Sequence, residues 1–229
     1  MNHILYKIFF CIFSFIYGGV FNACASYTLE VANVSLYNEG VQIVDSFKPK
    51  SKVRLEVGQH LVGGVNAVPL ALFISALNLS LQNVIFAKED ISLYQNGKPI
   101  TALNDKELKT QNFDFSSIVE SYHLFIPSSP MPSRGIPFIY RGYMGGFYIY
   151  DEMQFLARER MITSIELDWQ RSNRAVILSS ILQKNTLEPK GSPRGGFVLY
   201  APSALQVGKL ELEVRVGEER HTFALELKK

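Results

Sequence analysis

The chain has 229 residues, of which 47% are hydrophobic, and its 23 basic and 21 acidic residues leave a formal charge of +2. This length fits one large domain or one domain with a substantial insertion, and the hydrophobic content is too high for an intrinsically disordered protein. The near balance of charge, with no block rich in lysine or arginine, argues against nucleic-acid binding.

The first segment, residues 1–23, has the pattern of a secretory signal peptide. Lys7 supplies a positive charge ahead of an apolar run over residues 8–17, and Gly18-Gly19 follow that run. The run is too short to cross a bilayer comfortably, because a spanning helix needs about 20 apolar residues. An uncleaved membrane anchor is the alternative interpretation of this segment.

The segment Phe21-Asn22-Ala23-Cys24 resembles the lipobox of bacterial lipoproteins, although its first two residues depart from that family's preferences. The resemblance implies that Cys24 is diacylated and becomes the mature N-terminus. Ala25 in the next position implies sorting to the periplasmic face of the outer membrane. Ala23-Cys24-Ala25 also satisfies the small-x-small rule of ordinary signal peptidase, so the alternative is cleavage after Ala25 and a soluble periplasmic or secreted protein.

Cys11 and Cys24 are the two cysteines of the chain. Cys11 lies in the segment expected to be removed, and Cys24 is expected to be lipidated or cleaved away. We therefore expect a mature body that is held by its hydrophobic core, without thiol catalysis, cysteine-ligated zinc or iron–sulfur clusters.

The clearest β pattern runs from Lys209 to Leu227. Apolar and charged residues alternate over residues 209–216, and because strand side chains alternate between faces, the apolar ones share one buried face. A turn containing Gly217 follows, and the alternation then resumes. The pattern predicts a β-hairpin with one solvated face. The residues expected to point inward are Leu210, Leu212, Val214, Val216, Phe223, Leu225 and Leu227.

Short strands at regular spacing are also predicted before residue 100. The phase of the alternation shifts between Val31 and Val34, which indicates a β-bulge near Asn33. The most apolar stretch is Leu70 to Leu81, and the polar residues that alternate at its end favour a strand over a buried helix. Asn96-Gly97 is a strong hairpin-turn signal. Together these features predict an antiparallel β-sandwich.

The strand pattern over residues 27–100 and 195–227 resembles the Ig-like modules that are common in exported bacterial proteins. Between these parts, Thr101 to Gly191 has helical patterns that begin near Asp105, Asp151 and Asp168. We therefore predict a mainly β chain, an antiparallel Ig-like β-sandwich with a mostly helical insertion, preceded by an N-terminal signal segment. The predicted boundaries are 1–23 for the signal peptide, 24–100 for the first part of the sandwich, 101–191 for the insertion and 192–229 for the strands that complete the sandwich.

Within the insertion, Gly135 to Tyr150 is dense in glycine and aromatic residues. Glycine lets the backbone come close to a partner, and tyrosine and phenylalanine provide a large contact area at low entropic cost. One interpretation is a contact surface for another envelope protein, a glycan or a lipid interface. The other is that these aromatics cover an open edge of the sandwich. The candidate contact residues are Tyr140, Arg141, Tyr143, Phe147 and Tyr148.

The sequence carries no recognisable catalytic or metal-binding motif. The histidines have no metal-ligand spacing. His60 and His221 lie beside glycine turns and are expected to be solvated or capping residues, whereas His123 is expected at an interior or edge position. The G-x-S-x-G signature is absent. The segment Gly191 to Gly196 has a proline where a phosphate cradle needs a backbone N–H, so it is expected to be a turn before a strand.

These observations predict a non-catalytic cell-envelope protein that acts by binding or assembly, with no cofactor and no metal. The expected partners are the membrane, through a lipid on Cys24, and another envelope protein or a glycan, with no nucleic acid. The alternative is a periplasmic enzyme or small-ligand carrier with a pocket between the sandwich and the insertion.

Overall fold

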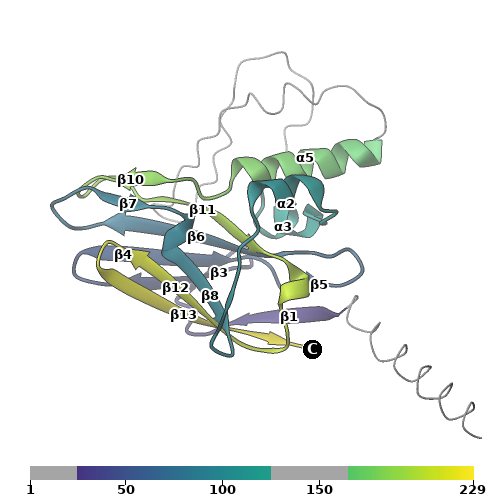
Figure 1. The fold of residues 1–229 in the computed structure, drawn as a ribbon, viewed down its shortest axis with the longest axis horizontal. Coiled ribbons are helices and arrows are strands. Elements are labelled where there is room, and N and C mark those ends of the chain that lie inside the picture. The colour runs from purple at the N-terminus through teal and green to yellow at the C-terminus, as the bar shows by residue number, and fades with distance from the viewer. Residues whose placement is uncertain (1–24, 125–164) are drawn as a thin grey trace, which may run out of the picture.

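A computed structural model of the chain describes residues 25–124 and 165–229, with the backbone alone for residues 165–169. This part of the chain is mainly β, and its strands form antiparallel sheets (Figure 1). The strands are β1 (Ser26–Val31), β2 (Leu36–Asn38), β3 (Val41–Phe47), β4 (Ser51–Val57), β5 (Leu61–Gly63), β6 (Leu70–Asn78), β7 (Val84–Phe86), β8 (Ile91–Gln95), β9 (Lys98–Ile100), β10 (Asn185–Leu187), β11 (Arg194–Tyr200), β12 (Gly208–Val216) and β13 (Glu219–Lys228).

Two large sheets form the body. The first, which we call the outer sheet, has six strands in the order β5-β1-β13-β12-β8-β9. The second, which we call the central sheet, has five strands in the order β11-β6-β4-β3-β2, and β10 and β7 form a separate two-stranded sheet. The prediction of a mainly β, antiparallel sandwich is confirmed at this level.

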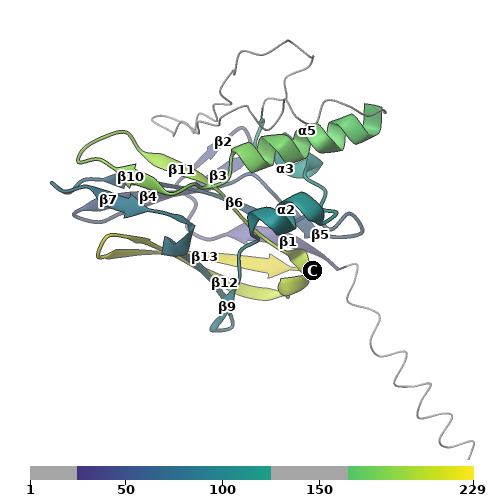
Figure 2. The ribbon, with the colours of Figure 1, turned by 45° about the horizontal axis from the view of Figure 1, so that its top comes forward.

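Three helices cover the face of the central sheet that is turned away from the outer sheet (Figures 1 and 2). They are α2 (Asp105–Thr110), α3 (Ser116–Ser121) and α5 (Ile165–Ser179), and two short 3-10 turns, η1 (Lys88–Asp90) and η2 (Pro202–Ala204), lie in connections. The helix predicted near Asp105 is α2. Its cap is Asn104, whose side chain accepts the Glu107 N–H at 2.9 Å while the Glu107 carboxylate accepts the Asn104 N–H at 2.8 Å. This capping box satisfies two backbone N–H groups of the first turn.

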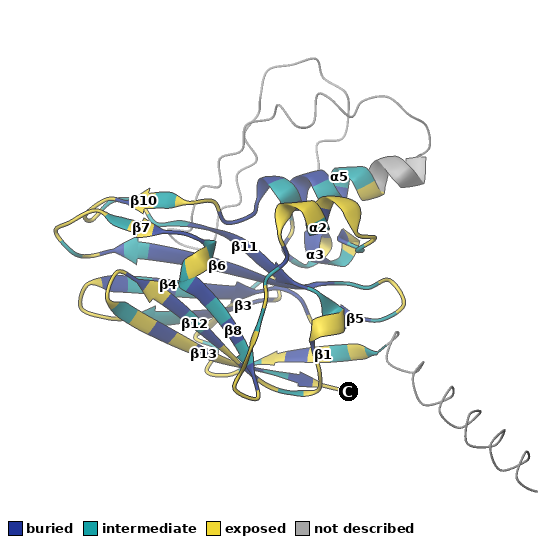
Figure 3. Cartoon of the chain, viewed as in Figure 1, coloured by how far each residue is buried: buried dark blue, intermediate teal, exposed yellow. Residues whose placement is uncertain are grey.

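The layers are held by two hydrophobic cores, whose buried residues appear in Figure 3. The first core fills the space between the two sheets, and the second lies between the central sheet and the helices. In the second core the Phe197 ring meets the Phe73 and Tyr122 rings edge-on, with centroids 5.1 and 4.8 Å apart. Such edge-to-face pairs add specific attraction to the burial of apolar area.

β6 explains why residues 70–78 are so apolar. It lies inside the central sheet, and it sends Leu72 and Ile74 into the first core and Ala71 and Phe73 into the second. A strand that is buried on both faces reads as a continuous hydrophobic run, because neither set of alternating positions meets water. The prediction of a strand is confirmed for Leu70–Asn78, whereas residues 79–81 lie in the loop that follows.

The two predicted hairpins are present. In β12–β13 the register pairs Val216 with Glu219, and all seven residues predicted to point inward are buried. At the β8–β9 turn, Asn96 and Gly97 have φ angles of 53° and 74°. Positive φ at both central residues defines the type I′ turn, which matches the right-handed twist of the strands.

The predicted bulge near Asn33 is wrong. Asn33 has a φ of 57° and lies in a turn at which the chain leaves the outer sheet, where Val31 pairs with Leu225, and enters the central sheet, where Leu36 pairs with Ile43. A change of sheet reverses which face is buried, and so it shifts the phase of the alternation as a bulge would.

The region between the two sets of strands is not helical throughout. β10 lies within residues 101–191 and pairs with β7, and Ile181 forms a bridge with Phe197 of β11. The helix predicted from about Asp168 is α5, which already begins at Ile165 and ends at Ser179. The helix predicted from Asp151 lies outside the described residues.

Candidate functional site

β13 connects the two ends of the sandwich. Glu219 begins this strand and Lys228 ends it, so at about 3.4 Å per residue the two lie roughly 30 Å apart. At the Glu219 end, which we call the loop end, lie the β3–β4 and β12–β13 turns and the β6–β7 loop (Figures 1 and 2). At the Lys228 end, which we call the N-terminal end, lie the start of β1 and β5.

Four polar side chains form a hydrogen-bonded cluster between the two sheets at the loop end. Nε2 of His221 lies 2.8 Å from Oγ of Ser51, and Nδ1 of His221 lies 2.9 Å from Oγ of Ser46. The Ser51 hydroxyl donates to the Glu219 carboxylate, which also accepts the Lys50 backbone N–H at 3.0 and 3.2 Å. We call Ser46, Ser51, Glu219 and His221 the polar clamp, because they join β3 and β4 of the central sheet to β13 of the outer sheet.

One arrangement of protons satisfies the clamp throughout. In this arrangement the Ser51 hydroxyl donates to Glu219, and the Ser51 oxygen accepts from Nε2–H of His221. Nδ1 of His221 accepts from the Ser46 hydroxyl. In this arrangement the imidazole is neutral and uses each ring nitrogen once. The clamp therefore places a neutral histidine and an ionised glutamate next to each other.

The electrostatics of the clamp agree with this assignment. Burial lowers the pKa of His221, and the Lys48 charge acts in the same direction, whereas the Glu219 charge opposes them. Burial would raise the pKa of Glu219, but hydrogen bonds from the Ser51 hydroxyl and the Lys50 N–H outweigh it and lower that pKa. Both groups therefore keep these charge states near neutral pH.

The clamp has the residue types of a serine hydrolase site but not its geometry. In such a site the acid holds the histidine nitrogen that points away from the serine, whereas here that nitrogen contacts Ser46 and the acid contacts Ser51. Ser51 and His221 have 0% exposure, so a substrate has no access to the hydroxyl. The cluster is arranged to connect the sheets.

The expectation that His221 is a solvated or capping residue is therefore wrong. His221 occupies the same alternating positions as Phe223, Leu225 and Leu227, and so the β13 backbone turns it inward with them. The alternation in β13 by itself predicts this inward orientation, whereas the expectation of a solvated or capping residue is based on the nearby turn at Gly217. Polar partners from β3 and β4 make the burial tolerable, because a buried imidazole needs hydrogen bonds.

Apolar side chains are exposed on the loops and strand ends near the clamp. Phe47 at the end of β3 is 67% exposed and Leu81 in the β6–β7 loop is 84% exposed, and Leu79 and Ile85 nearby are also exposed. We call these four residues the apolar tip. The Leu79 N–H donates to the Lys50 carbonyl at 2.8 Å, which connects the two loops. Exposed apolar groups gathered at one end of a domain favour contact with a partner.

The N-terminal end carries a second, smaller apolar surface. Leu61 on β5 is 61% exposed and Val65 in the following turn is 85% exposed. The carbonyl of Ala25 accepts the Gly64 N–H at 3.0 Å, and Ser26 pairs with Gly63. The start of the described chain is thus fastened to this turn.

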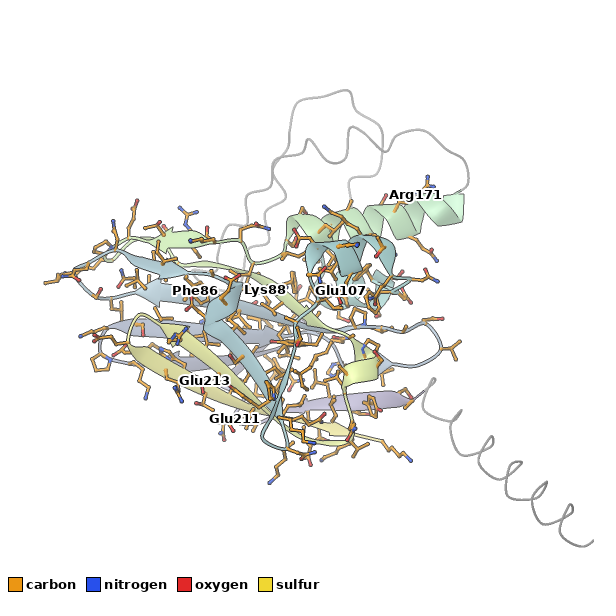
Figure 4. All side chains as sticks on the ribbon, viewed as in Figure 1. Phe86, Lys88, Glu107, Arg171, Glu211 and Glu213 are labelled. Atoms are coloured by element: carbon orange, nitrogen blue, oxygen red, sulfur yellow. The ribbon has the colours of Figure 1, made fainter. Side chains whose placement is uncertain are left out.

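The charged face of the outer sheet is laid out as an ordinary solvated surface. Glu211 and Glu213, labelled in Figure 4, lie on β12 in the positions that alternate with the buried ones. Arg220 forms an ion pair with Glu213 at 3.0 Å. Across residues 25–124 and 165–229, no group of three or more histidine, cysteine or acidic side chains is placed to hold a metal ion.

The remaining sequence-predicted positions are distributed as follows. Cys24 and the five candidate contact residues of the aromatic segment lie outside the described residues. His60 is exposed as expected. His123 is exposed as well, with Nε2 at 2.9 Å from the Glu39 carbonyl, so it is an edge residue and not an interior one. The segment that begins at Gly191 leads into β11, as predicted.

No protein family, no curated protein and no solved structure matches this chain. In the described part of the chain, moreover, no helix combines the length and the apolar character that crossing a membrane requires. The functional conclusion therefore rests on the chain's own residues.

Proposed function

We propose that the chain is a non-catalytic cell-envelope lipoprotein with an Ig-like β-sandwich, which acts by binding another envelope protein or a glycan. In this proposal the signal peptide ends at residue 23. An acylated Cys24 then holds the body at the periplasmic face of the outer membrane. The hydrogen bond between Ala25 and Gly64 is the observation that favours this assignment over soluble export.

Cleavage at the two candidate sites would affect this hydrogen bond differently. Cleavage before Cys24 leaves the Ala25 carbonyl in place as the acceptor of the Gly64 N–H at 3.0 Å. Cleavage after Ala25 would remove the acceptor and place a charged amino group on Ser26, the first residue of β1. Gly64 is partly exposed, so water can replace the lost acceptor, and the difference that favours a mature chain with Ala25 is on the order of 1 kcal/mol.

The packing of the layers supports a role in binding more than one in catalysis. A pocket between the sandwich and the helices would be the site of the alternative enzyme or ligand carrier. In the described part of that interface the space is filled by the second core, in which Phe73, Tyr122 and Phe197 are almost fully buried. The clamp, the one described cluster with hydrolase residue types, is closed to substrate.

The order of the elements supports the proposed insertion. Strands from residues 26–100 and 194–228 supply both large sheets, and α2, α3 and α5 come between them in sequence. The helices lie together on one face of the central sheet, as expected for an insertion that is added to a complete sandwich. β10 is the part of residues 101–191 that pairs with a strand of the first segment.

Two surfaces are candidates for partner binding. The apolar tip lies at the loop end, roughly 30 Å along β13 from the N-terminal end, so in an anchored protein it would face away from the membrane. The second is the aromatic segment, with Tyr140, Arg141, Tyr143, Phe147 and Tyr148. It remains a prediction from the sequence.

The mass of the mature N-terminus tests the anchor. We expect a chain that begins at diacylated Cys24 and fractionates with the outer membrane, and a C24S variant that loses both the acyl mass and this location. A chain that begins at an unmodified Ser26, or one that retains residue 1, would contradict the proposal.

Cross-linking from single positions tests the binding surfaces. A photoreactive amino acid at Leu81 or Tyr143 should give a discrete cross-linked band in intact cells. The same group at Thr222, an exposed position of the outer sheet, should not. Equal labelling at all three positions, or none at any, would count against a binding role for these surfaces.

A further inference from the structure

We infer that the turn at the N-terminal end inserts its exposed apolar side chains into the lipid headgroup region beside the anchor, so that this end of the sandwich lies against the membrane. The inference rests on the proposed lipid anchor at Cys24. It adds a contact that the folded body itself makes with the bilayer, through Leu61 and Val65.

The turn holds these side chains outward in a defined geometry. Gly63 and Val68 exchange two backbone hydrogen bonds of 2.8 and 3.1 Å, and the Ala67 N–H donates to the Gly64 carbonyl at 3.1 Å. Val65 lies between these pairs and is 85% exposed. Because the turn is closed by its own hydrogen bonds, Val65 is presented to its surroundings without loss of backbone freedom on binding.

The anchor and the turn are adjacent. Ser26 and Thr28 pair with Gly63 and Leu61, and the Ala25 carbonyl binds the Gly64 N–H. Cys24 is the residue before Ala25, and consecutive Cα atoms are about 3.8 Å apart. A lipid on Cys24 would therefore begin next to this turn, with no linker that could hold the body away from the bilayer.

The charged side chains near this end lie outside the turn. Residues 61–68 contain no charged side chain. Glu30, on the neighbouring β1, forms an ion pair with Lys228 at 2.6 Å. The same Lys228 ammonium lies 3.7 Å from Glu226. Asp114, whose N–H donates to the Asn66 carbonyl, accepts the Ser116 N–H at 2.8 Å. An uncharged turn with exposed apolar side chains can enter the headgroup region without desolvating a charge.

The apolar tip provides an internal comparison. Leu81 is 84% exposed and Val65 is 85% exposed, so the two side chains meet water to the same extent in the isolated protein. The turn after β5, which carries Val65, and the β6–β7 loop, which carries Leu81, lie at opposite ends of the sandwich (Figure 1). Exposure alone therefore predicts the same behaviour at both positions, whereas the inference predicts lipid contact at Val65 and none at Leu81.

The experiment places an environment-sensitive NBD fluorophore on V65C, L61C or L81C. The full chain is expressed and processed in cells, and the mature protein is reconstituted into vesicles of phosphatidylethanolamine and phosphatidylglycerol. Signal cleavage removes Cys11 and acylation blocks the thiol of Cys24, so the label reaches the introduced cysteine alone. Doxyl-labelled lipids then report contact with the bilayer by quenching.

We expect a blue-shifted emission and at least twofold stronger quenching at positions 65 and 61 than at position 81. Equal quenching at the three positions would overturn the inference. Since Val65 is exposed, V65C should unfold at the wild-type temperature, and L61C gives a second measurement on β5. The mass of the same sample separates the two proposals: acylated Cys24 without quenching refutes the membrane contact alone, whereas an unacylated Cys24 refutes both.

Discussion

Nε2 of His221 lies 2.8 Å from Oγ of Ser51, and this contact joins the first residues of β13 in the outer sheet to the start of β4 in the central sheet. Both side chains are fully buried, and Glu219 and Ser46 complete the hydrogen bonds of the pair. A serine, a histidine and a glutamate thus form a link between two sheets. The clamp makes the stability of the sandwich sensitive to the charge of one imidazole.

We expect the free energy of unfolding to fall as the pH is lowered from above 6.5, the ordinary pKa of histidine, through the lower pKa of folded His221. Burial holds the pKa of His221 below its ordinary value of 6.5, against the opposing charge of Glu219. In this range the unfolded chain binds a proton more readily than the folded protein. The contribution of His221 is therefore complete above pH 6.5 and is lost as the pH falls through the folded pKa. Urea unfolding at a series of pH values measures the change.

The H221Q variant is the control for this prediction. Glutamine cannot titrate, so its stability should change less with pH over the same range, although its absolute stability should be lower. Glu219 does not interfere, because its pKa is held below its ordinary value of 4.5 by hydrogen bonds that outweigh burial. Equal pH dependence in the two proteins would contradict the role assigned to His221.

Tyr122 contributes both a ring and a hydroxyl to the second core. Its hydroxyl donates toward the backbone carbonyls of Glu56 and Ala71, at 3.0 and 2.9 Å, and so fastens α3 to the central sheet. Y122F should cost about 1–2 kcal/mol, because these carbonyls lose their donor, and Y122A should cost about 4 kcal/mol, because a cavity forms as well. Guanidinium unfolding gives both values. Equal effects of the two substitutions would show that the ring is not packed as described.

Gly196 and Gly97 should respond differently to substitution by alanine. Leu182 lies against the edge of β11, where its N–H donates to the Phe197 carbonyl. A Cβ at Gly196 would lie 2.5 Å from the Leu182 backbone, so G196A should cost about 3 kcal/mol through overpacking. A Cβ at Gly97 meets nothing within 4 Å, and G97A should cost about 1 kcal/mol for its φ of +74°. Thermal unfolding should therefore rank the wild type, G97A and G196A in falling order. A reversal of the two variants would exclude the close approach at Gly196.

Several features of the fold were predictable from the sequence, because short-range chemistry determines them. The alternation in β12 and β13 and the turn residues Asn96 and Gly97 identify two hairpins without any knowledge of distant contacts. The same alternation also predicts that His221 is buried, because His221 lies on the same face of the strand as Phe223. For the candidate site, the sequence could provide this orientation but not the partners.

What the sequence by itself determined is therefore the strand-rich character of the body and the face that each strand buries. Tertiary structure alone decided which elements cover those faces. Phe73 pairs with Phe197 across more than a hundred residues, β10 joins β7, and Ser51 meets His221 from the opposite sheet. The physical reason is that hydrophobic periodicity shows which side of an element is buried but not which other element packs against that side. Partners that are distant in sequence are selected by the packing of the whole core.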